Sequence, residues 1–227
     1  MKVNNEQKSN IKADNHSLFR NEEKIIKNKY RFFIGMFDNQ TPDFHNILNE
    51  LYNADDKSIL ELRIMSPGGL VVECQQIVNL LENKFKENSV AYIESHASSA
   101  GAFTFIRANK RVIYWNSRIM FHNYSGGYVG KYKDMKDRFE FDEKHILNFL
   151  GYAKRFFTKK EWNELINGKD FWFDAKEMLK RGIATHIILN GKEYDRKKGL
   201  KKLKKFLKKN KEISLDDYLK SIEEKEN

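Results

Sequence analysis

Hydrophobic positions change their spacing several times along this chain, and the changes predict strands that alternate with helices. Apolar and aromatic runs at 30–37, 58–65 and 89–94 suit buried strands. Between them, apolar residues at 44–52 and 70–85 recur three and four positions apart, as on one face of an amphipathic helix. This alternation predicts βαβ units and a mostly parallel sheet, which is an α/β fold.

The second half of the chain continues the pattern with more helix. A helix is expected from about Ser99, and a long polar helical stretch from 131 to 157. The remaining elements that the pattern predicts are strands at 111–115, 118–122 and 183–189, with helices near 158–166 and 174–181. In parallel sheets, binding and catalytic residues usually lie where strands end and helices begin. Two such junctions, "MSPGGL" and "SHASSAGAF", are rich in Gly, Pro and Ser.

Composition limits the class of protein. The chain has 227 residues, of which 40% are hydrophobic, enough to bury one substantial core. A single cysteine, Cys74, leaves no intrachain disulfide and suits a reducing, cytoplasmic location. No apolar run approaches the roughly 18 to 20 residues of a membrane span, and the N-terminus lacks the apolar core of a signal peptide. We therefore expect neither a membrane span nor secretion.

The formal net charge of +10 comes from one segment. Residues 196–211 contain one arginine, nine lysines and no acid, so the charges of the remainder balance. The apolar residues of this segment form a stripe on a lysine-rich helix: Leu200, Leu203, Phe206 and Leu207. Such a helix is either simply solvated or contacts an anionic membrane, nucleic acid or an acidic partner.

Three segments are expected from these patterns. A polar N-terminal arm, 1–29, is predicted to be an unstructured arm or one short helix outside the core. Residues 30–194 form the folded domain, and 195–227 form the lysine-rich helical tail.

Tandem serines at the second junction allow two interpretations. Ser98 or Ser99 can cap the helix that follows. Alternatively, one of them is a nucleophile at a tight turn, with the first N–H groups of the helix facing an oxyanion. Acyl transfer also needs a base and a group that orients it. His122 closes a predicted strand and Asp170 lies in "GKDFWF", so the chain has a candidate for each role.

The chain order Ser, His, Asp differs from that of trypsin, subtilisin and the α/β-hydrolases, so the sequence does not support those folds. The other histidines show no paired spacing of metal ligands: His16, His45, His96, His145 and His186. We expect no metal site and no cofactor.

Four motifs, in order and at comparable spacing, resemble the proteolytic subunit of the Clp protease. They are "MSPGGL", "SHASSAGAF", "RIMFHNYSGGYVG" and "GKDFWFDAKEMLKRGIATHII", and the similarity covers residues 32–189. The resemblance implies a ClpP/crotonase-like fold with repeated βαβ units and a long handle helix. The aromatic "GKDFWF" segment is similar to that of divergent Clp-like peptidases of bacteriophages, which can act as head-maturation proteases.

The resemblance also implies roles for individual residues. It selects Ser99 as the nucleophile, His122 as the base and Asp170 as the acid, with Ser98 left to cap or pack and Asp174 as a helix cap. The oxyanion donors it implies are backbone N–H groups, which here belong to Gly68 or Gly69 and to Ala100.

The segment after His122 resembles the family's strand that pairs with an extended substrate. This implies substrate-binding roles for Ser125, Gly126 and Gly127 through main-chain hydrogen bonds, and hence broad sequence preference. Two departures alter the expected pocket wall. His96 stands where relatives often have glutamine, and Ala100 replaces a larger residue, usually methionine.

By resemblance, the chain is identified as a serine endopeptidase that hydrolyses polypeptides inside a chamber of homo-oligomeric rings. It is either a Clp-type degradative subunit working with an AAA+ unfoldase or a phage head-maturation protease acting on capsid or scaffold proteins in the host cytoplasm. Two alternatives keep the fold. One is a catalytically silent scaffold subunit, and the other is a crotonase-type acyl-CoA enzyme, which needs oxyanion donors but no serine nucleophile.

Overall fold

The computed structural model describes residues 17–20, 23–26, 28–38 and 42–209. The strands it contains are β1 (Ser17–Arg20), β2 (Glu23–Ile26), β3 (Lys29–Ile34), β4 (Ile59–Ser66), β5 (Ser89–Ser98), β6 (Lys110–Tyr114), β7 (Arg118–Phe121), β8 (Phe171–Asp174), β9 (His186–Leu189) and β10 (Lys192–Asp195). The helices are α1 (Pro42–Asn53), α2 (Val71–Asn83), α3 (Ala100–Arg107), α4 (Tyr132–Gly151), α5 (Lys159–Ile166), α6 (Ala175–Arg181) and α7 (Arg196–Lys209), with a 3₁₀ helix, η1, at Tyr152–Phe156.

A mostly parallel sheet forms the centre of the molecule. Its order is β10-β9-β6-β5-β4-β3, and β7 and β8 continue from the second half of β5. Strands β3, β4, β5, β6 and β9 are mutually parallel, as βαβ connections require. The α/β fold with repeated βαβ units that the hydrophobic pattern predicts is confirmed.

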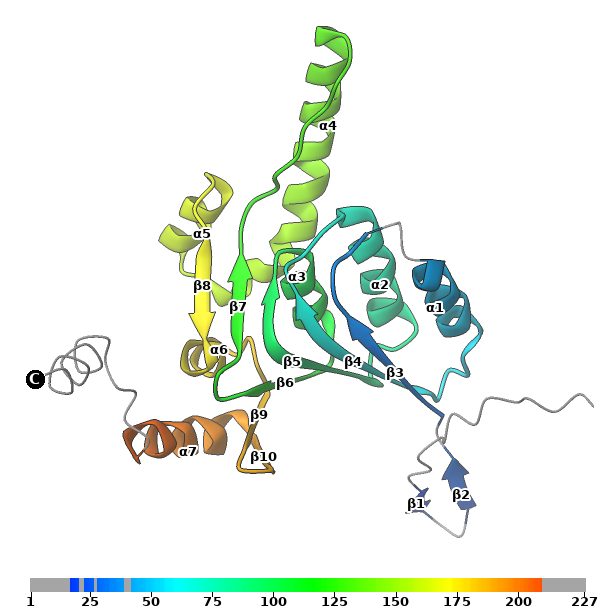
Figure 1. The fold of residues 1–227 in the computed structure, drawn as a ribbon, viewed down its shortest axis with the longest axis vertical. Helices are drawn as coiled ribbons and strands as arrows, with labels where there is room; N and C mark the ends of the chain where they lie inside the picture. The colour runs from blue at the N-terminus through cyan, green and yellow to red at the C-terminus, as the bar shows by residue number, and fades with distance from the viewer. Residues whose placement is uncertain (1–16, 21–22, 27, 39–41, 210–227) are drawn as a thin grey trace, which may run out of the picture.

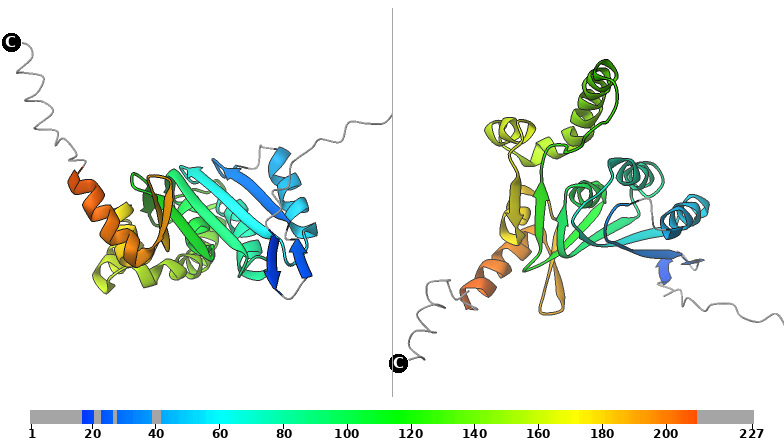
Figure 2. Two further views of the ribbon diagram at one scale, coloured as in Figure 1. Left: turned by 90° about the horizontal axis from the view of Figure 1, so that it is seen from below. Right: turned by 45° about the horizontal axis from the view of Figure 1, so that its top comes forward.

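Helices α1, α2 and α3 cover one face of this sheet, and Figure 2 shows them in a row. The residue pattern of strand β4 explains why the helices pack on this face. Leu60, Leu62 and Ile64 alternate along it and are at most 1% exposed, because they point into the helices. Gly101 on α3 lies so close to Ser66 that an added Cβ would come within 2.8 Å of the serine Cβ. This contact brings α3 down onto the end of β4.

The opposite face of β4 carries charge. Glu61 is 2% exposed and accepts hydrogen bonds from Arg31 at 2.7 Å and Arg63 at 2.8 Å, and it pairs with Lys29 at 2.5 Å. Burial alone would raise the pKa of Glu61, but the three cations outweigh it and lower the pKa from 4.5 to about 2. The sheet therefore has an apolar side under the helices and an ion-paired side away from them.

Helix α4 projects from the body, and η1 brings the chain back to it (Figure 1). Leu150, in its last turn, is the one residue of α4 that is fully buried. The long polar helical stretch that the sequence predicts at 131–157 is thus confirmed, with its last turn tightened into 3₁₀ geometry. The projecting shape agrees with the handle helix that the resemblance implies.

Three strand pairs were missed at the sequence level. β1 and β2 form an antiparallel hairpin, where one short helix or an unstructured arm is predicted for 1–29; residues 1–16 lie outside the described residues. β8 pairs with β7, and β10 pairs with β9 beyond the strand expected to be the last. Asn190 and Gly191, both with positive φ, form the turn between β9 and β10.

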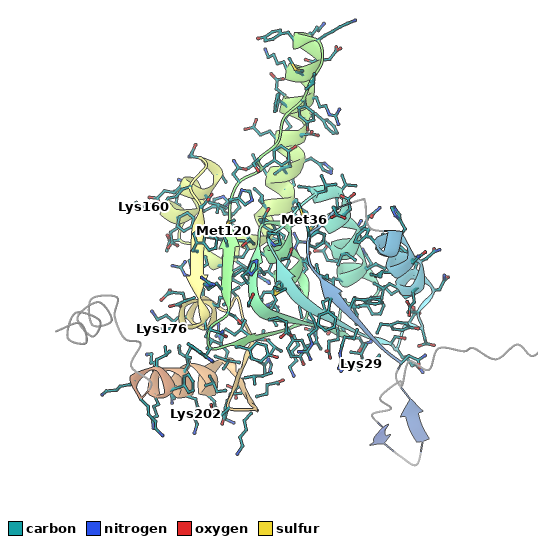
Figure 3. The ribbon with its side chains drawn as sticks, in the orientation of Figure 1. Lys29, Met36, Met120, Lys160, Lys176 and Lys202 are labelled. Atoms are coloured by element: carbon teal, nitrogen blue, oxygen red, sulfur yellow. The ribbon has the colours of Figure 1, made fainter. Side chains whose placement is uncertain are left out.

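Helix α7 confirms that the first part of the lysine-rich segment is helical, and it packs against α6, β9 and β10. Leu203 is fully buried, while Lys202, labelled in Figure 3, faces solvent. The apolar stripe is therefore used to attach the helix to the body. The rest of the predicted tail, 210–227, lies outside the described residues.

Candidate active site

A tight turn follows β4 and forms one wall of the candidate site. Gly68 and Gly69 have φ of +112° and +138°, a region that residues with a Cβ rarely adopt. Phe37 fixes the turn, since its N–H donates to the Gly68 carbonyl at 2.9 Å and its own carbonyl accepts from Leu70 at 2.8 Å. The Gly68 N–H donates to Ser66 Oγ at 3.1 Å. The turn is thus held from both sides.

Ser99 lies directly against this turn. An added Cβ on Gly68 would come within 2.7 Å of Ser99 Cβ and 3.2 Å of its Oγ, so only glycine fits there. Ser99 itself has φ of 52° and ψ of −122°, which is strained for a residue with a side chain. It is the N-cap residue of α3, yet its hydroxyl makes no capping hydrogen bond. Capping therefore does not explain this serine.

Strand β7 connects Ser99 to His122. The pairing of β5 with β7 matches Ser98 with Met120, and the Ser99 N–H donates to the Met120 carbonyl at 3.0 Å. Met120 is labelled on β7 in Figure 3. His122 follows two residues later, just beyond the end of the strand. The strand register thus delivers a serine and a histidine from distant parts of the chain to one place.

Both residues line one cavity of about 60 Å³. Gly69, Ala100 and Ser125 also line it, whereas Gly68, Ser98 and His96 do not. The cavity therefore brings together the Ser99 hydroxyl, the His122 imidazole and one backbone position from each junction, Gly69 and Ala100. Ser98 is 5% exposed and packs, and His96 bonds its neighbour Ser95, with Nδ1 3.0 Å from Oγ. The expected effect of His96 on the pocket wall is not seen.

Asp170 is placed differently. It immediately precedes β8, whose antiparallel pairing with β7 ends at Phe121 and Phe171. Continuing that register by one step would set His122 opposite Asp170, where Cβ atoms are about 5 Å apart. Asp170 is nevertheless exposed, does not line the cavity, and makes no hydrogen bond to His122 among the described residues. The third candidate is therefore close in register but not connected.

Comparison with known proteins identifies the family. The model of the Clp protease family matches residues 16–191. The chain belongs to the Clp protease family. It is 30% identical over 145 residues to the ATP-dependent Clp protease proteolytic subunit 2 of Tropheryma whipplei (strain Twist), covering 60% of this chain and 78% of that protein. The family match ends before β10 and α7, so the lysine-rich helix lies beyond it.

In this Clp family chain, the segment after His122 is exposed and extended. Residues 124–127 are exposed and belong to no strand of the described part of the chain. Ser125 and Gly126 line a neighbouring cavity of about 660 Å³ under α4, and Gly127 lines neither this cavity nor the one at Ser99. Unpaired extended backbone is what an added peptide strand requires.

Cys74, which falls among the apolar positions of the helix predicted at 70–85, is also part of the cavity wall. Its Sγ lies 3.2 Å from the Ala100 carbonyl and 3.4 Å from Thr104 Oγ1. Burial raises the pKa of the thiol to about 12, so it is not a nucleophile at neutral pH. Its helical spacing predicted burial but not the contact with α3, which depends on how α2 and α3 pack.

The described residues contain no helix long and apolar enough to cross a membrane.

The helix cap at Asp174 that the resemblance implies is confirmed. Asp174 accepts a hydrogen bond from the Glu177 N–H at 2.7 Å, and Gly182 ends α6 with φ of 76°. These two caps fix where α6 begins and where it ends.

Proposed function

We propose that this chain is a serine endopeptidase of the Clp type, with Ser99 as its nucleophile. The observation that carries the proposal is the environment of Ser99, a strained serine at a strand-to-helix turn, without a capping bond, in one cavity with His122. Such a turn exposes a hydroxyl to substrate and aims the first N–H groups of the helix at the reacting carbonyl.

In the proposed reaction, Ser99 Oγ attacks the carbonyl carbon of the scissile peptide bond, and His122 takes the hydroxyl proton. The carbonyl π bond opens to an oxyanion; when it re-forms, the C–N bond breaks and His122 returns the proton to the leaving amine. Water then releases the acyl group by the same route. The described residues supply an atom for each of these transfers, and no cofactor enters the balance.

The oxyanion donors can be ranked by their existing partners. The Gly68 N–H already donates to Ser66 Oγ, whereas Gly69 lines the cavity. We therefore assign one donor to the Gly69 N–H and the other to that of Ala100, which begins α3 and has no carbonyl four residues earlier within the helix. Gly68 has a different role, since it makes room for Ser99.

Substrate contacts and assembly follow from the family. Ser125, Gly126 and Gly127 are proposed to pair with an extended polypeptide through main-chain hydrogen bonds, because this segment is exposed and unpaired. We assign the peptidase to residues 30–194, which contain every candidate residue, and we propose homo-oligomeric rings with α4 between them. The proposed site would serve either Clp-type degradation with an AAA+ unfoldase or phage head maturation, and these two uses are alternatives.

The catalytically silent scaffold remains the competing proposal, and one observation favours it: Asp170 is not bonded to His122. Without an orienting acid, an imidazole adopts the productive tautomer and orientation less often. A crotonase-type acyl-CoA enzyme has no such observation behind it, since it needs the two N–H donors but not the serine.

Peptide hydrolysis by Ser99→Ala and Ser98→Ala separates the candidates. The two variants each remove one hydroxyl from adjacent positions, and Ser98 serves as the matched control because it is buried outside the cavity. The proposal predicts that Ser99→Ala abolishes hydrolysis while Ser98→Ala retains most of it. A wild-type protein that assembles but hydrolyses no peptide would establish the silent scaffold instead.

A further inference from the structure

A second cavity, of about 790 Å³, lies away from Ser99 at the C-terminal ends of α2, α3 and α6. Five arginines and one lysine line it, against two glutamates. None of these residues lines the cavity of the candidate active site. The concentration of positive charge is notable because all of these residues except Arg196 lie outside the lysine-rich segment, in the part of the chain whose charges sum to zero.

Two of the arginines have structural tasks. Arg107 pairs with Glu82 and donates to the Phe149 carbonyl at 3.0 Å. Arg181 forms two hydrogen bonds with Glu161, at 2.8 and 2.9 Å. These contacts fasten α4 and α5 to the body and pair both side chains with carboxylates, although Arg107 Nε is buried with no hydrogen-bond partner among the described residues.

Arg111 is different, because every hydrogen bond that its guanidinium donates goes to a backbone carbonyl. The acceptors are Ile183 at 2.7 Å, Ala108 at 2.8 Å, Gly182 at 3.3 Å and Asn109 at 3.4 Å. Burial, and then the nearby Arg155, lower its pKa to about 10, so it stays charged at neutral pH. Its charge is solvated by carbonyls but balanced by no carboxylate of the described residues.

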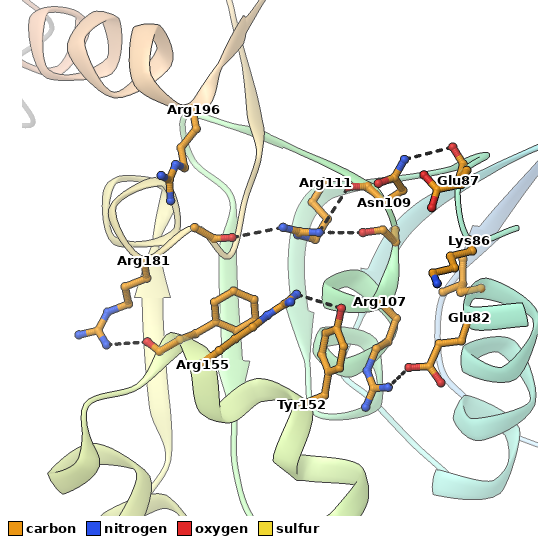
Figure 4. A pocket seen from close by; sticks show the side chains of 14 residues that line it. Glu82, Lys86, Glu87, Arg107, Asn109, Arg111, Tyr152, Arg155, Arg181 and Arg196 are labelled. Carbon is orange, nitrogen blue, oxygen red and sulfur yellow. Dashed lines mark hydrogen bonds and ion pairs between the residues drawn. The ribbon is translucent and has the colours of Figure 1, made fainter.

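The remaining cations of the cavity have no acidic partner in the described part of the chain. Arg155 donates to Tyr152 Oη at 3.0 Å and lies 4.2 Å from the centre of the Tyr152 ring, while Arg196 and Lys86 form no ion pair there. Figure 4 shows Arg111, Arg155 and Arg196 approaching the cavity from different elements. Glu87 is the one lining carboxylate not used by an arginine. Four cations thus face one carboxylate.

We propose that this cavity binds an oligophosphate group. Guanidinium groups match phosphate oxygens in pairs, and several of them converge here from separate, rigidly packed elements. An oligophosphate carries several negative charges within a few ångströms, which fits a surplus of charge concentrated in one cavity. The volume lies in the range of small-molecule sites, about 300 to 1,000 Å³. The site is independent of the proposed hydrolysis, since it shares no residue with it.

Titration calorimetry with sodium triphosphate on the full chain tests the proposal, at constant ionic strength so that screening does not vary. The test variant is Arg155→Gln with Arg196→Gln, because neither side chain holds a carboxylate or a carbonyl. The matched control is Lys205→Gln with Lys208→Gln, which removes the same charge from the exposed face of α7. Circular dichroism of each protein reports whether it is folded.

The proposal predicts saturable binding of triphosphate to the wild type and the lysine control, and at least about tenfold weaker binding to the arginine variant, from the loss of charge-assisted contacts. Absence of saturable binding overturns it. Equal weakening in the two variants, or weakening in the lysine control alone, also overturns it, because the α7 lysines would then be the binding site.

Two further ligands identify the source of the phosphate. ATP binding as tightly as triphosphate would show that the phosphate chain alone is recognised, and tighter binding of ATP would add a nucleoside contact to the site. A glutamate-rich peptide of equal charge that binds the cavity more tightly than triphosphate would overturn the oligophosphate assignment in favour of an acidic protein segment. Peptide hydrolysis by the arginine variant is expected to equal that of the wild type.

Discussion

Ser99 and Asp170 both approach β7, from opposite sides, and the protein holds them by different means. On the β5 side, strand pairing continues into a hydrogen bond from the Ser99 N–H to Met120, and Gly68 packs against the serine. On the β8 side, pairing stops at Phe171 and Asp170 is left exposed. The difference shows that the fold holds the proposed nucleophile by backbone contacts on one side of β7, while the proposed orienting acid on the other side is exposed and not bonded to His122.

The largest effect is expected from His122→Ala, which removes the proposed proton acceptor just beyond the end of β7. General acid and base catalysis contributes about 10²- to 10⁴-fold, so kcat should fall by about that factor while KM changes little. Steady-state peptide hydrolysis measures this. Retention of more than half the wild-type kcat would remove His122 from the reaction.

Gly68→Ala tests how firmly Ser99 is held. The added methyl group would overlap Ser99 Cβ, and the alanine would have to adopt the positive φ of Gly68, which is strained for a residue with a side chain. We therefore expect about a 100-fold loss of activity together with a lower melting temperature. Gly151→Ala is the matched control, since an added Cβ there meets nothing within 4 Å and the residue lines neither the cavity at Ser99 nor the one under α4. Similar losses in both variants would show that the close approach at Gly68 is unimportant.

A smaller effect is predicted for the loosely held side. Asp170→Asn should lower kcat by about tenfold, well below the loss in His122→Ala, because the carboxylate is exposed and not bonded to the imidazole. Charge screening should also weaken its contribution, so the ratio of wild-type to variant kcat should shrink at high salt. A loss as large as that of His122→Ala would mean that the working enzyme closes the gap between these two residues.

The sequence reveals part of the arrangement around Ser99, but not all of it. The "MSPGGL" and "SHASSAGAF" junctions predict tight turns where strands end and helices begin, and the resemblance implies that the glycine pair and Ser99 belong to one site. The close packing of Gly68 against Ser99 is seen only in the structure. The choice between Gly68 and Gly69 could not be made, since it depends on the hydrogen bond from Gly68 to Ser66, a contact set by tertiary structure.

Elements with strong periodicity were predicted well, including α2, α4 and the central strands. The missed strands are short and lie at edges, where pairing rather than pattern decides the conformation. Asn190–Gly191 is a dipeptide typical of β-hairpin turns, so the β9–β10 hairpin could have been predicted from the sequence. By contrast, the five arginines of the second cavity come from separated segments, and only the fold brings them together.

The smallest effect on catalysis is predicted at Glu61, on the sheet face away from the helices. Because its pKa is about 2 in the folded protein and ordinarily 4.5, its charge contributes stability above pH 4.5, and this is lost as the pH falls towards 2. Glu61→Gln should cost about 2 to 3 kcal/mol at pH 7 and progressively less below pH 4, with kcat per folded molecule unchanged. Urea denaturation at several pH values measures the difference.

Glu50→Gln on the exposed side of α1 is the control for that series and should leave stability within about 0.5 kcal/mol of the wild type at every pH. A Glu61→Gln protein that keeps its stability but loses hydrolysis would contradict the separation between the ion-paired face and the site.

The most direct test of the account is the position of a covalent adduct. A fluorophosphonate reacts with an activated serine, so the intact, assembled protein should be labelled once per chain, and peptide mapping by mass spectrometry should place the adduct on Ser99. Labelling should disappear in Ser99→Ala and persist in Ser98→Ala. An adduct on Ser98, or no adduct on a folded and assembled protein, would contradict the proposal that Ser99 is the nucleophile.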